Sequence, residues 1–161
     1  ANASRSGRRG PMAAPGTYQA RLKVGEWTKT VSFEAHMDPR IAKEGYVSPE
    51  DITGQVSLAL KARDTLSRAR LAAARLEEAL ENASGGQKAA LEEIDHELIT
   101  SPRRYSQPML VDQIAYLYQN LDHADQRAGR DAIERYESLT AQLEEQIGKL
   151  DEILGLTEED R

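Results

Sequence analysis

The segment PGTYQARLKVGEWTKTVSFEAHM, residues 15–37, decides the fold of this chain. We predict one strand over 15–24, a turn at Gly25-Glu26-Trp27 and a second strand over 28–37. Apolar and polar side chains alternate along both strands, which indicates a hairpin with one buried face and one face in water. The apolar positions are Tyr18, Ala20, Leu22, Val24, Val31, Phe33, Ala35 and Met37.

Two strands alone are marginally stable in water and need a third strand or a helix to pack against. Residues 1–16 contain Ser, Gly, Arg, Ala and Pro without a period, so we interpret them as a flexible lead-in. We therefore expect the hairpin to be the remnant of an immunoglobulin-like or fibronectin-like sandwich. Its apolar face should pack against helix ends, missing strands or a neighbouring chain, and the chain should be the end of something larger.

A strong helix start follows the hairpin and a connector at 41–47. Ser48 can cap the helix, Pro49 suits the first helical position, and Asp51 can reach back as in a capping box. We predict helices at about 49–83, 87–99, 108–121 and 130–154. The polar stretch 122–129 should separate the last two.

Each predicted helix carries an apolar or small-residue stripe. In the first it comprises Ile52, Val56, Ala59, Ala62, Leu66, Ala69, Ala73, Leu76 and Leu80. The others carry Leu91, Ile94 and Leu98, then Leu110, Ile114, Leu117, Tyr118 and Leu121, then Ile133, Tyr136, Leu139, Leu143, Ile147, Leu150 and Leu154. The mean spacing in the two long helices is about 3.5 residues, which is typical of bundle packing.

The predicted fold class is therefore mainly α: an antiparallel four-helix bundle with an N-terminal β-hairpin. We divide the chain into a lead-in at 1–16, the hairpin at 17–40, the bundle at 48–154 and a polar tail at 155–161.

The amino-acid composition excludes or disfavours several classes of function. Of 161 residues, 39% are hydrophobic, 5% aromatic and 30% charged, which suits long solvated helices. The net charge of −6 disfavours nucleic-acid binding, and the one basic cluster, Arg5, Arg8 and Arg9, lies in the lead-in. The chain contains no cysteine, which excludes disulfides and thiolate chemistry, and no apolar run of about 18 residues that could span a membrane.

One pair of residues has metal-ligand spacing. Glu93 and His96 share a helix face, as in the Glu-x-x-His motif of di-iron bundles. Such a site needs a second copy, but Asn120 precedes His123 at that spacing. We therefore predict a solvated face, with no metal, no cofactor and no catalytic residue. Asp122, His123 and Asp125 are interpreted as a capped turn, and His36 as a surface residue.

Two places are candidates for interaction with a partner. Arg103, Arg104 and Tyr105 lie together in the predicted loop between the second and third helices, where a solvated loop is the alternative. Tyr116 lies off the apolar stripe of its helix, so we expect it to contact the hairpin or a partner.

Several of these segments resemble a known family. Gly10-Pro11, Pro15-Gly16-Thr17-Tyr18, Met37-Asp38-Pro39-Arg40 and residues 110–118 (LVDQIAYLY) are similar to the C-terminal region of bacterial sortilin-like proteins. These are β-propeller proteins with BNR (Asp-box) repeats, often labelled glycosyl hydrolases. The resemblance runs from Gly10 to about Leu154. The basic, Gly-containing start departs from it, because earlier sandwich strands would be expected there.

The resemblance implies a module at the C-terminus of an exported protein, in the periplasm, at the outer surface or outside the cell. The glycosidase label of the family rests on the propeller, so no catalytic residue carries over to this chain. We expect a non-catalytic structural or assembly module whose partner is the upstream propeller or a second protein chain. Two alternatives stay open: an accessory domain of a propeller glycoside hydrolase, and a self-associating module, a homo-oligomer paired through its hairpin edges.

Overall fold

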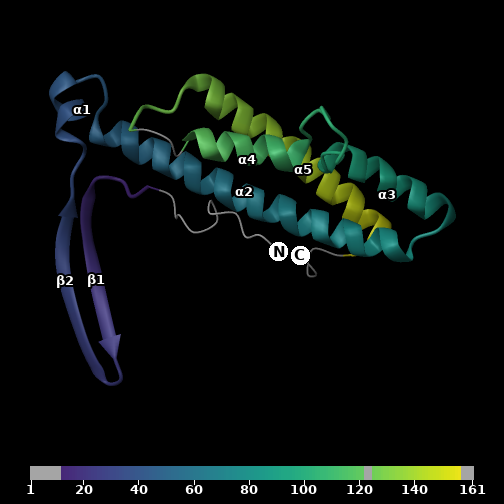
Figure 1. Ribbon diagram of the computed structural model, residues 1–161, viewed down its shortest axis with the longest axis horizontal. Coiled ribbons are helices and arrows are strands. Elements are labelled where there is room, and N and C mark those ends of the chain that lie inside the picture. The colour runs from purple at the N-terminus through teal and green to yellow at the C-terminus, as the bar shows by residue number, and fades with distance from the viewer. Residues whose placement is uncertain (1–11, 122–124, 157–161) are drawn as a thin grey trace. The chain divides into compact units, whose positions relative to one another are not determined.

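The computed structural model describes residues 12–121 and 125–156. It is mainly helical: a two-stranded antiparallel hairpin is followed by four main helices that pack together (Figure 1), which confirms the predicted class. The elements are β1 (Gly16–Val24), β2 (Trp27–Ala35), α1 (Pro39–Glu44), α2 (Pro49–Asn82), α3 (Gly85–Leu98), α4 (Leu110–Leu121) and α5 (Arg130–Leu154). The chain divides into two compact units, residues 1–60 with 121–129 and residues 61–120 with 130–161, which are described separately.

The hairpin turn is shorter than the sequence predicted. Val24 pairs directly with Trp27, so Gly25 and Glu26 alone form the turn and Trp27 is the first residue of β2. Gly25 has a φ of 58°, the left-handed conformation that a two-residue turn of type II′ requires at its first position. β2 ends at Ala35, two residues before the predicted end.

The Asp38-Pro39-Arg40 segment begins a short helix. Asp38 caps α1, because its carboxylate accepts a hydrogen bond from the main-chain N of Arg40 at 2.8 Å. The Arg40 guanidinium also binds this carboxylate, and together these bonds lower the pKa of Asp38 to about 2. Gly45 ends the helix with a φ of 71°. Part of the predicted connector is therefore a short helix, defined by its two caps.

The start of α2 confirms the predicted capping box. The main-chain N of Asp51 donates to Ser48 Oγ at 3.1 Å, and the main-chain N of Ser48 donates to Asp51 Oδ2 at 3.0 Å. The Arg127 guanidinium donates to the same carboxylate at 2.7 Å. The hydrogen bonds from Arg127 and Ser48 lower the pKa of Asp51 to about 2.

A buried glutamine completes this first unit. Gln55 is only 1% exposed, although glutamine usually lies at the surface. Its Nε2 donates to the main-chain O of Leu121 at 2.5 Å, and its Oε1 accepts from the main-chain N of Gln126 at 3.0 Å. The amide thus holds both sides of the connection between α4 and α5.

The second unit contains an apolar core between its helices. The predicted stripe of α3 is buried, as are four consecutive stripe residues of α5, Leu139, Leu143, Ile147 and Leu150. On α2 the small side chains Ala62, Ala69 and Ala72 are at most 2% exposed. Ile133 departs from the prediction, because it lies near the start of α5 and is 41% exposed.

Ion pairs flank this core. Asp151 is buried, and Arg75 donates to its Oδ1 at 2.6 Å. Arg68 binds Glu144 nearer the surface. The contacts join α2 to α5.

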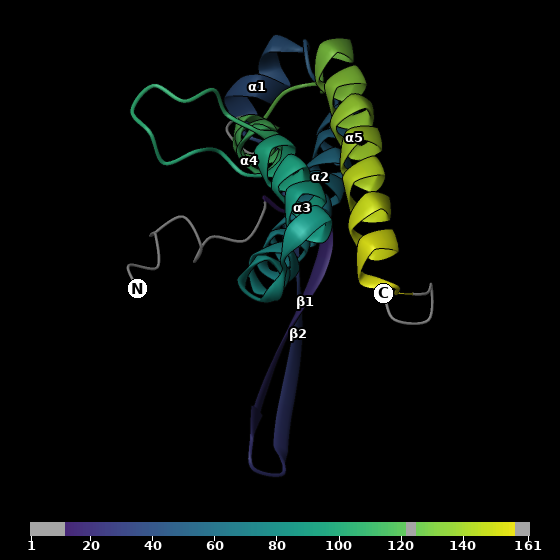
Figure 2. The same ribbon diagram turned by 90° about the vertical axis from the view of Figure 1, so that its right-hand side faces the viewer.

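The connection from α3 to α4 does not reverse the chain as a short up-down connection would. In Figures 1 and 2, α4 continues in the direction of α3, and the loop at residues 99–109 bulges between them. Thr100 closes the base of this loop, because its Oγ1 accepts from the main-chain N of Met109 at 2.9 Å.

Candidate interaction surface

The hairpin presents an apolar face to solvent. Register places Tyr18 opposite Phe33, Ala20 opposite Val31 and Val24 opposite Trp27, so these side chains lie on one side of the sheet. The rings of Tyr18 and Phe33 stack with centroids 5.9 Å apart. We define the apolar hairpin face as Tyr18, Ala20, Leu22, Val24, Trp27, Val31 and Phe33.

Within the described part of the chain this face is not buried, so its packing against missing strands or a neighbouring chain stays a prediction. Five of its seven residues are at least half exposed: Leu22 (60%), Val24 (64%), Trp27 (54%), Val31 (52%) and Phe33 (51%). Alternation established that the two faces differ, but among the described residues nothing shields the apolar one. A clustered, exposed apolar surface of this kind is a candidate interaction site.

The hairpin also has free strand edges. Among residues 12–121 and 125–156 the sheet contains only β1 and β2, so each nine-residue strand has one edge without a neighbouring strand. Unpaired main-chain groups along such edges can accept another strand.

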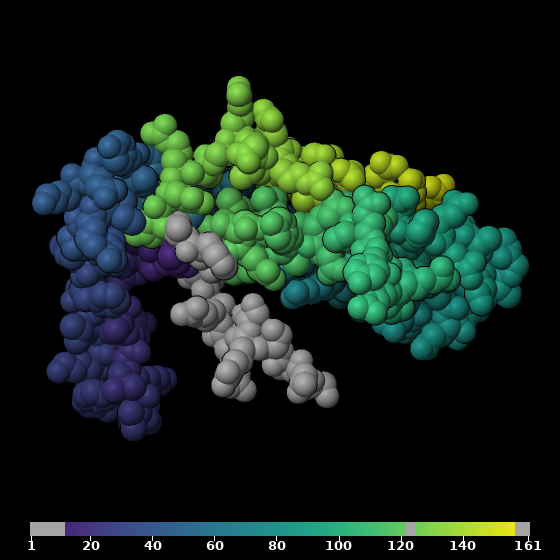
Figure 3. Space-filling model, turned by 45° about the horizontal axis from the view of Figure 1, so that its top comes forward, coloured from purple at the N-terminus to yellow at the C-terminus, as the bar shows by residue number. Residues whose placement is uncertain are grey.

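The predicted contact loop is exposed and internally ordered. Tyr105 is 91% exposed and has a φ of 63°, which is uncommon for an aromatic residue. The Arg104 guanidinium lies 5.1 Å from its ring centroid, a cation–π contact. Ser106 donates to the main-chain O of Arg103 through its N and its Oγ. The loop projects at the surface of the second unit (Figure 3), where a role in binding stays a prediction.

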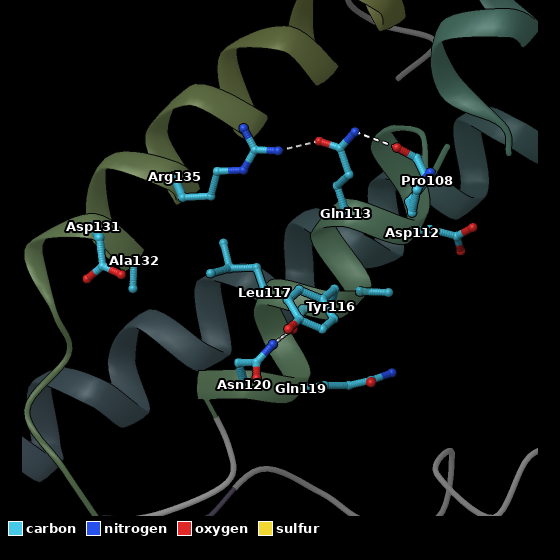
Figure 4. Close-up of a pocket in the computed structure, with 11 residues that line it drawn as sticks. Pro108, Asp112, Gln113, Tyr116, Leu117, Gln119, Asn120, Asp131, Ala132 and Arg135 are labelled. Atoms are coloured by element: carbon cyan, nitrogen blue, oxygen red, sulfur yellow. Dashed lines mark hydrogen bonds between the residues drawn. The ribbon is translucent and has the colours of Figure 1, made fainter. Parts of the chain in front are cut away.

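Tyr116 lies at a different place. It is 71% exposed and lines a groove of about 760 Å³ between α4 and α5. Leu117, Ala132 and Pro108 also line this α4–α5 groove, and the carboxylates of Asp112 and Asp131 lie along it (Figure 4). The Arg135 guanidinium donates to Gln113 Oε1, and Gln113 Nε2 donates to the main-chain O of Pro108. Arg103 lines a different pocket, so Tyr116 and the predicted contact loop lie at separate places on the second unit.

The residues with possible metal chemistry are at the surface. Glu93 and His96 are exposed on α3. His36 is exposed just after β2, and its Nε2 lies 3.5 Å from Glu34 Oε2. The described part of the chain contains no cluster of three potential metal ligands. Asp122 and His123 lie outside the described residues.

Sequence reasoning missed several residues of these surfaces. Trp27 was not placed on the apolar side of the hairpin, because the turn was taken to be one residue too long. Lys29 falls on that side by the predicted alternation, but only apolar residues were assigned to the face. A Gly-x pair between alternating segments is the signal of a two-residue turn, and it would have set the correct register. Asp131 and Ala132 were missed because the groove depends on how α4 and α5 pack.

Among the described residues, no helix has the length and apolar character needed to cross a membrane. Comparison with family models, curated proteins and solved structures gave no match. The functional assignment therefore rests on the exposed surfaces and on the resemblance described above.

Proposed function

We propose that this chain is a non-catalytic assembly module of a larger exported β-propeller protein. The observation that supports the proposal best is the exposed apolar hairpin face. In this role the face is covered in the assembled protein, either by the region that precedes this chain or by a second protein chain.

The physical argument starts from the cost of leaving this face in water. Covering apolar surface yields roughly 25 cal/mol per Å², and two-stranded hairpins need such cover to be stable. Aromatic side chains supply most of the binding energy in many interfaces, and Trp27 and Phe33 are both half exposed here. The face is thus suited to packing against a second apolar surface.

The resemblance supplies the context of the proposal. A sandwich buries the inward faces of two sheets against each other, and the apolar hairpin face has the alternation of one such inward face. The helices offer hydrophobic packing and ion pairs, which hold a module together without a reacting group.

The test compares this chain with a longer protein that carries the proposed propeller before it. Hydrogen exchange should slow in the hairpin, residues 16–35, in the longer protein. Exchange in the α5 segment 139–150 serves as the control and should be equal in both. With both proteins kept monomeric, equal exchange of the hairpin would contradict cover by the region that precedes this chain.

A second measurement addresses catalysis directly. The 161-residue chain should not hydrolyse chromogenic glycosides above the rate of a heat-unfolded sample. Turnover that follows the folded chain through purification would overturn the non-catalytic assignment.

A further inference from the structure

Lys29 interrupts the apolar hairpin face with a positive charge. It pairs with Leu22 in the register, and on its own strand it lies between Trp27 and Val31 on the same side. Covering this face would take the ammonium group out of water, which is costly unless a carboxylate meets it. The surface that covers the hairpin should therefore combine apolar atoms with an acidic group.

This requirement disfavours two simple partners. Two identical hairpin faces packed against each other would enclose two Lys29 ammonium groups, and this side of the sheet contains no carboxylate to pair with them. Edge pairing alone would leave the apolar face in water, and inward-pointing charges on edge strands are a known defence against it.

The α4–α5 groove has the required chemistry. Tyr116, Leu117 and Ala132 give it an apolar lining, and Asp131 is exposed beside Ala132 at the start of α5 (Figure 4). Its one arginine, Arg135, already donates to Gln113. Its volume of about 760 Å³ lies within the range of pockets that bind small molecules.

Charge along the chain supports the same pairing. Before Asp38 there are six Lys and Arg against two Asp and Glu, and from Asp38 onwards there are 15 against 25. Three of those six basic residues, Arg21, Lys23 and Lys29, lie in the hairpin against Glu26 and Glu34, while the part of the chain that forms the helices is acidic. Oppositely charged surfaces on copies of one chain attract each other and guide their encounter.

We propose that the apolar hairpin face of one copy docks into the α4–α5 groove of a second copy. Lys29 then pairs with Asp131, and Trp27 packs against Tyr116 and Leu117. The inference rests on the proposed function, since it names the second chain that covers the hairpin. Reciprocal docking closes a dimer, whereas head-to-tail docking forms a longer series.

The test is light scattering across a concentration series, with fluorescence recorded in parallel. Trp27 is the only tryptophan of the chain, so its emission reports on the hairpin alone. The mass should rise above 17.9 kDa with concentration, and the emission should shift to shorter wavelength in step. High salt should weaken the association.

Charge reversal tests the pairing itself. Lys29→Glu and Asp131→Lys should each weaken association at least tenfold, and the double variant should recover to within about threefold of the original. The matched controls are Lys23→Glu, on the opposite hairpin face, and Glu137→Lys, on α5 away from the groove. Both controls should leave association unchanged. Circular dichroism checks that each variant is folded.

The other outcomes separate the two proposals. A monomer at all concentrations would overturn the second-copy inference, while the exchange experiment with the longer protein would still decide the proposed function. Association that Lys29→Glu weakens and Asp131→Lys does not affect would reject the groove and retain the hairpin as an assembly surface. Equal weakening by Lys29→Glu and Lys23→Glu would indicate edge pairing and overturn the inference.

Discussion

The side-chain amide of Gln55 bonds the main-chain O of Leu121, a residue 66 positions later in the chain. The same amide accepts a hydrogen bond from the main-chain N of Gln126. One buried side chain thereby fixes the end of α4 and the connection that follows it. A polar group in this position is stabilising only while its partners are in place.

Replacing this amide should destabilise the first unit. Gln55→Leu leaves the buried main-chain O of Leu121 without its bond and removes the acceptor of the Gln126 N–H, and we expect a loss of about 2 kcal/mol in the free energy of unfolding. Gln87→Leu changes an exposed glutamine on α3 and should alter stability by no more than about 0.5 kcal/mol. Urea unfolding measures both. Equal urea midpoints for the two variants would show that the hydrogen bonds of the Gln55 amide do not stabilise the first unit.

The Asp51–Arg127 pair predicts a pH dependence. The pKa of Asp51 is lowered to about 2, from an ordinary value near 4, by hydrogen bonds from Arg127 and Ser48. Its contribution to stability is therefore fully present above about pH 5, and it is lost as the pH falls from about 4 towards 2. Asp51→Asn should lower stability at neutral pH and flatten the decline in this acid range.

The measurement is the urea midpoint at pH values from 2 to 7. Arg127→Gln should behave like Asp51→Asn, because it removes the largest cause of the lowered pKa. Asp38, whose pKa is also lowered to about 2 by Arg40, is retained in every variant, so a residual slope is expected. An unchanged slope in Asp51→Asn would contradict the assignment.

The buried alanines of α2 predict that larger side chains at their positions destabilise the protein. Ala69 is fully buried, so Ala69→Leu inserts a bulky group into a packed core and should cost about 2 kcal/mol. Ala74 is exposed on the same helix and provides the matched control, since Ala74→Leu should be nearly neutral. Thermal unfolding of both variants tests this. If Ala69→Leu unfolds at the original temperature, the core at this point is not closely packed.

The buried ion pair of the second unit predicts that removing its arginine lowers the free energy of unfolding substantially. Arg75→Ala removes the guanidinium that donates to the buried carboxylate of Asp151, and we expect a loss of about 3 kcal/mol. Arg63→Ala, which breaks the exposed contact with Asp64, is the control and should cost less than about 1 kcal/mol. Chemical unfolding distinguishes the two.

The helices could be predicted from sequence because their signals are local. Ser48 and Asp51 cap α2, and the first residue of α5, Arg130, was placed correctly from the polar stretch before it. α1 was missed because six residues carry no apolar period, and its existence depends on the caps at Asp38 and Gly45.

Burial was harder to predict, because it depends on partners distant in the chain. From the sequence alone Gln55 would be assigned to the surface, because its hydrogen-bond partners Leu121 and Gln126 are distant in the chain. For the hairpin, alternation separated an apolar face from a polar one but could not show what covers the apolar face, and Phe33 is half exposed in this chain. Tyr116, which lines the α4–α5 groove, was selected because it lies off its stripe, and its role in binding stays a prediction. Asp131 was not found, because nothing local connects it to α4.

The hydrogen bonds of Gln55 also determine when the first unit can fold during synthesis. Its partners Leu121 and Gln126 are translated long after it, at a ribosomal rate that puts about 3 to 13 seconds between Gln55 and Leu121. The first unit is therefore completed only after residues 61–120 have been made. A chain interrupted before Leu121 would carry the finished hairpin and an unfinished unit, so chaperone contact and premature cleavage should be most frequent in that interval.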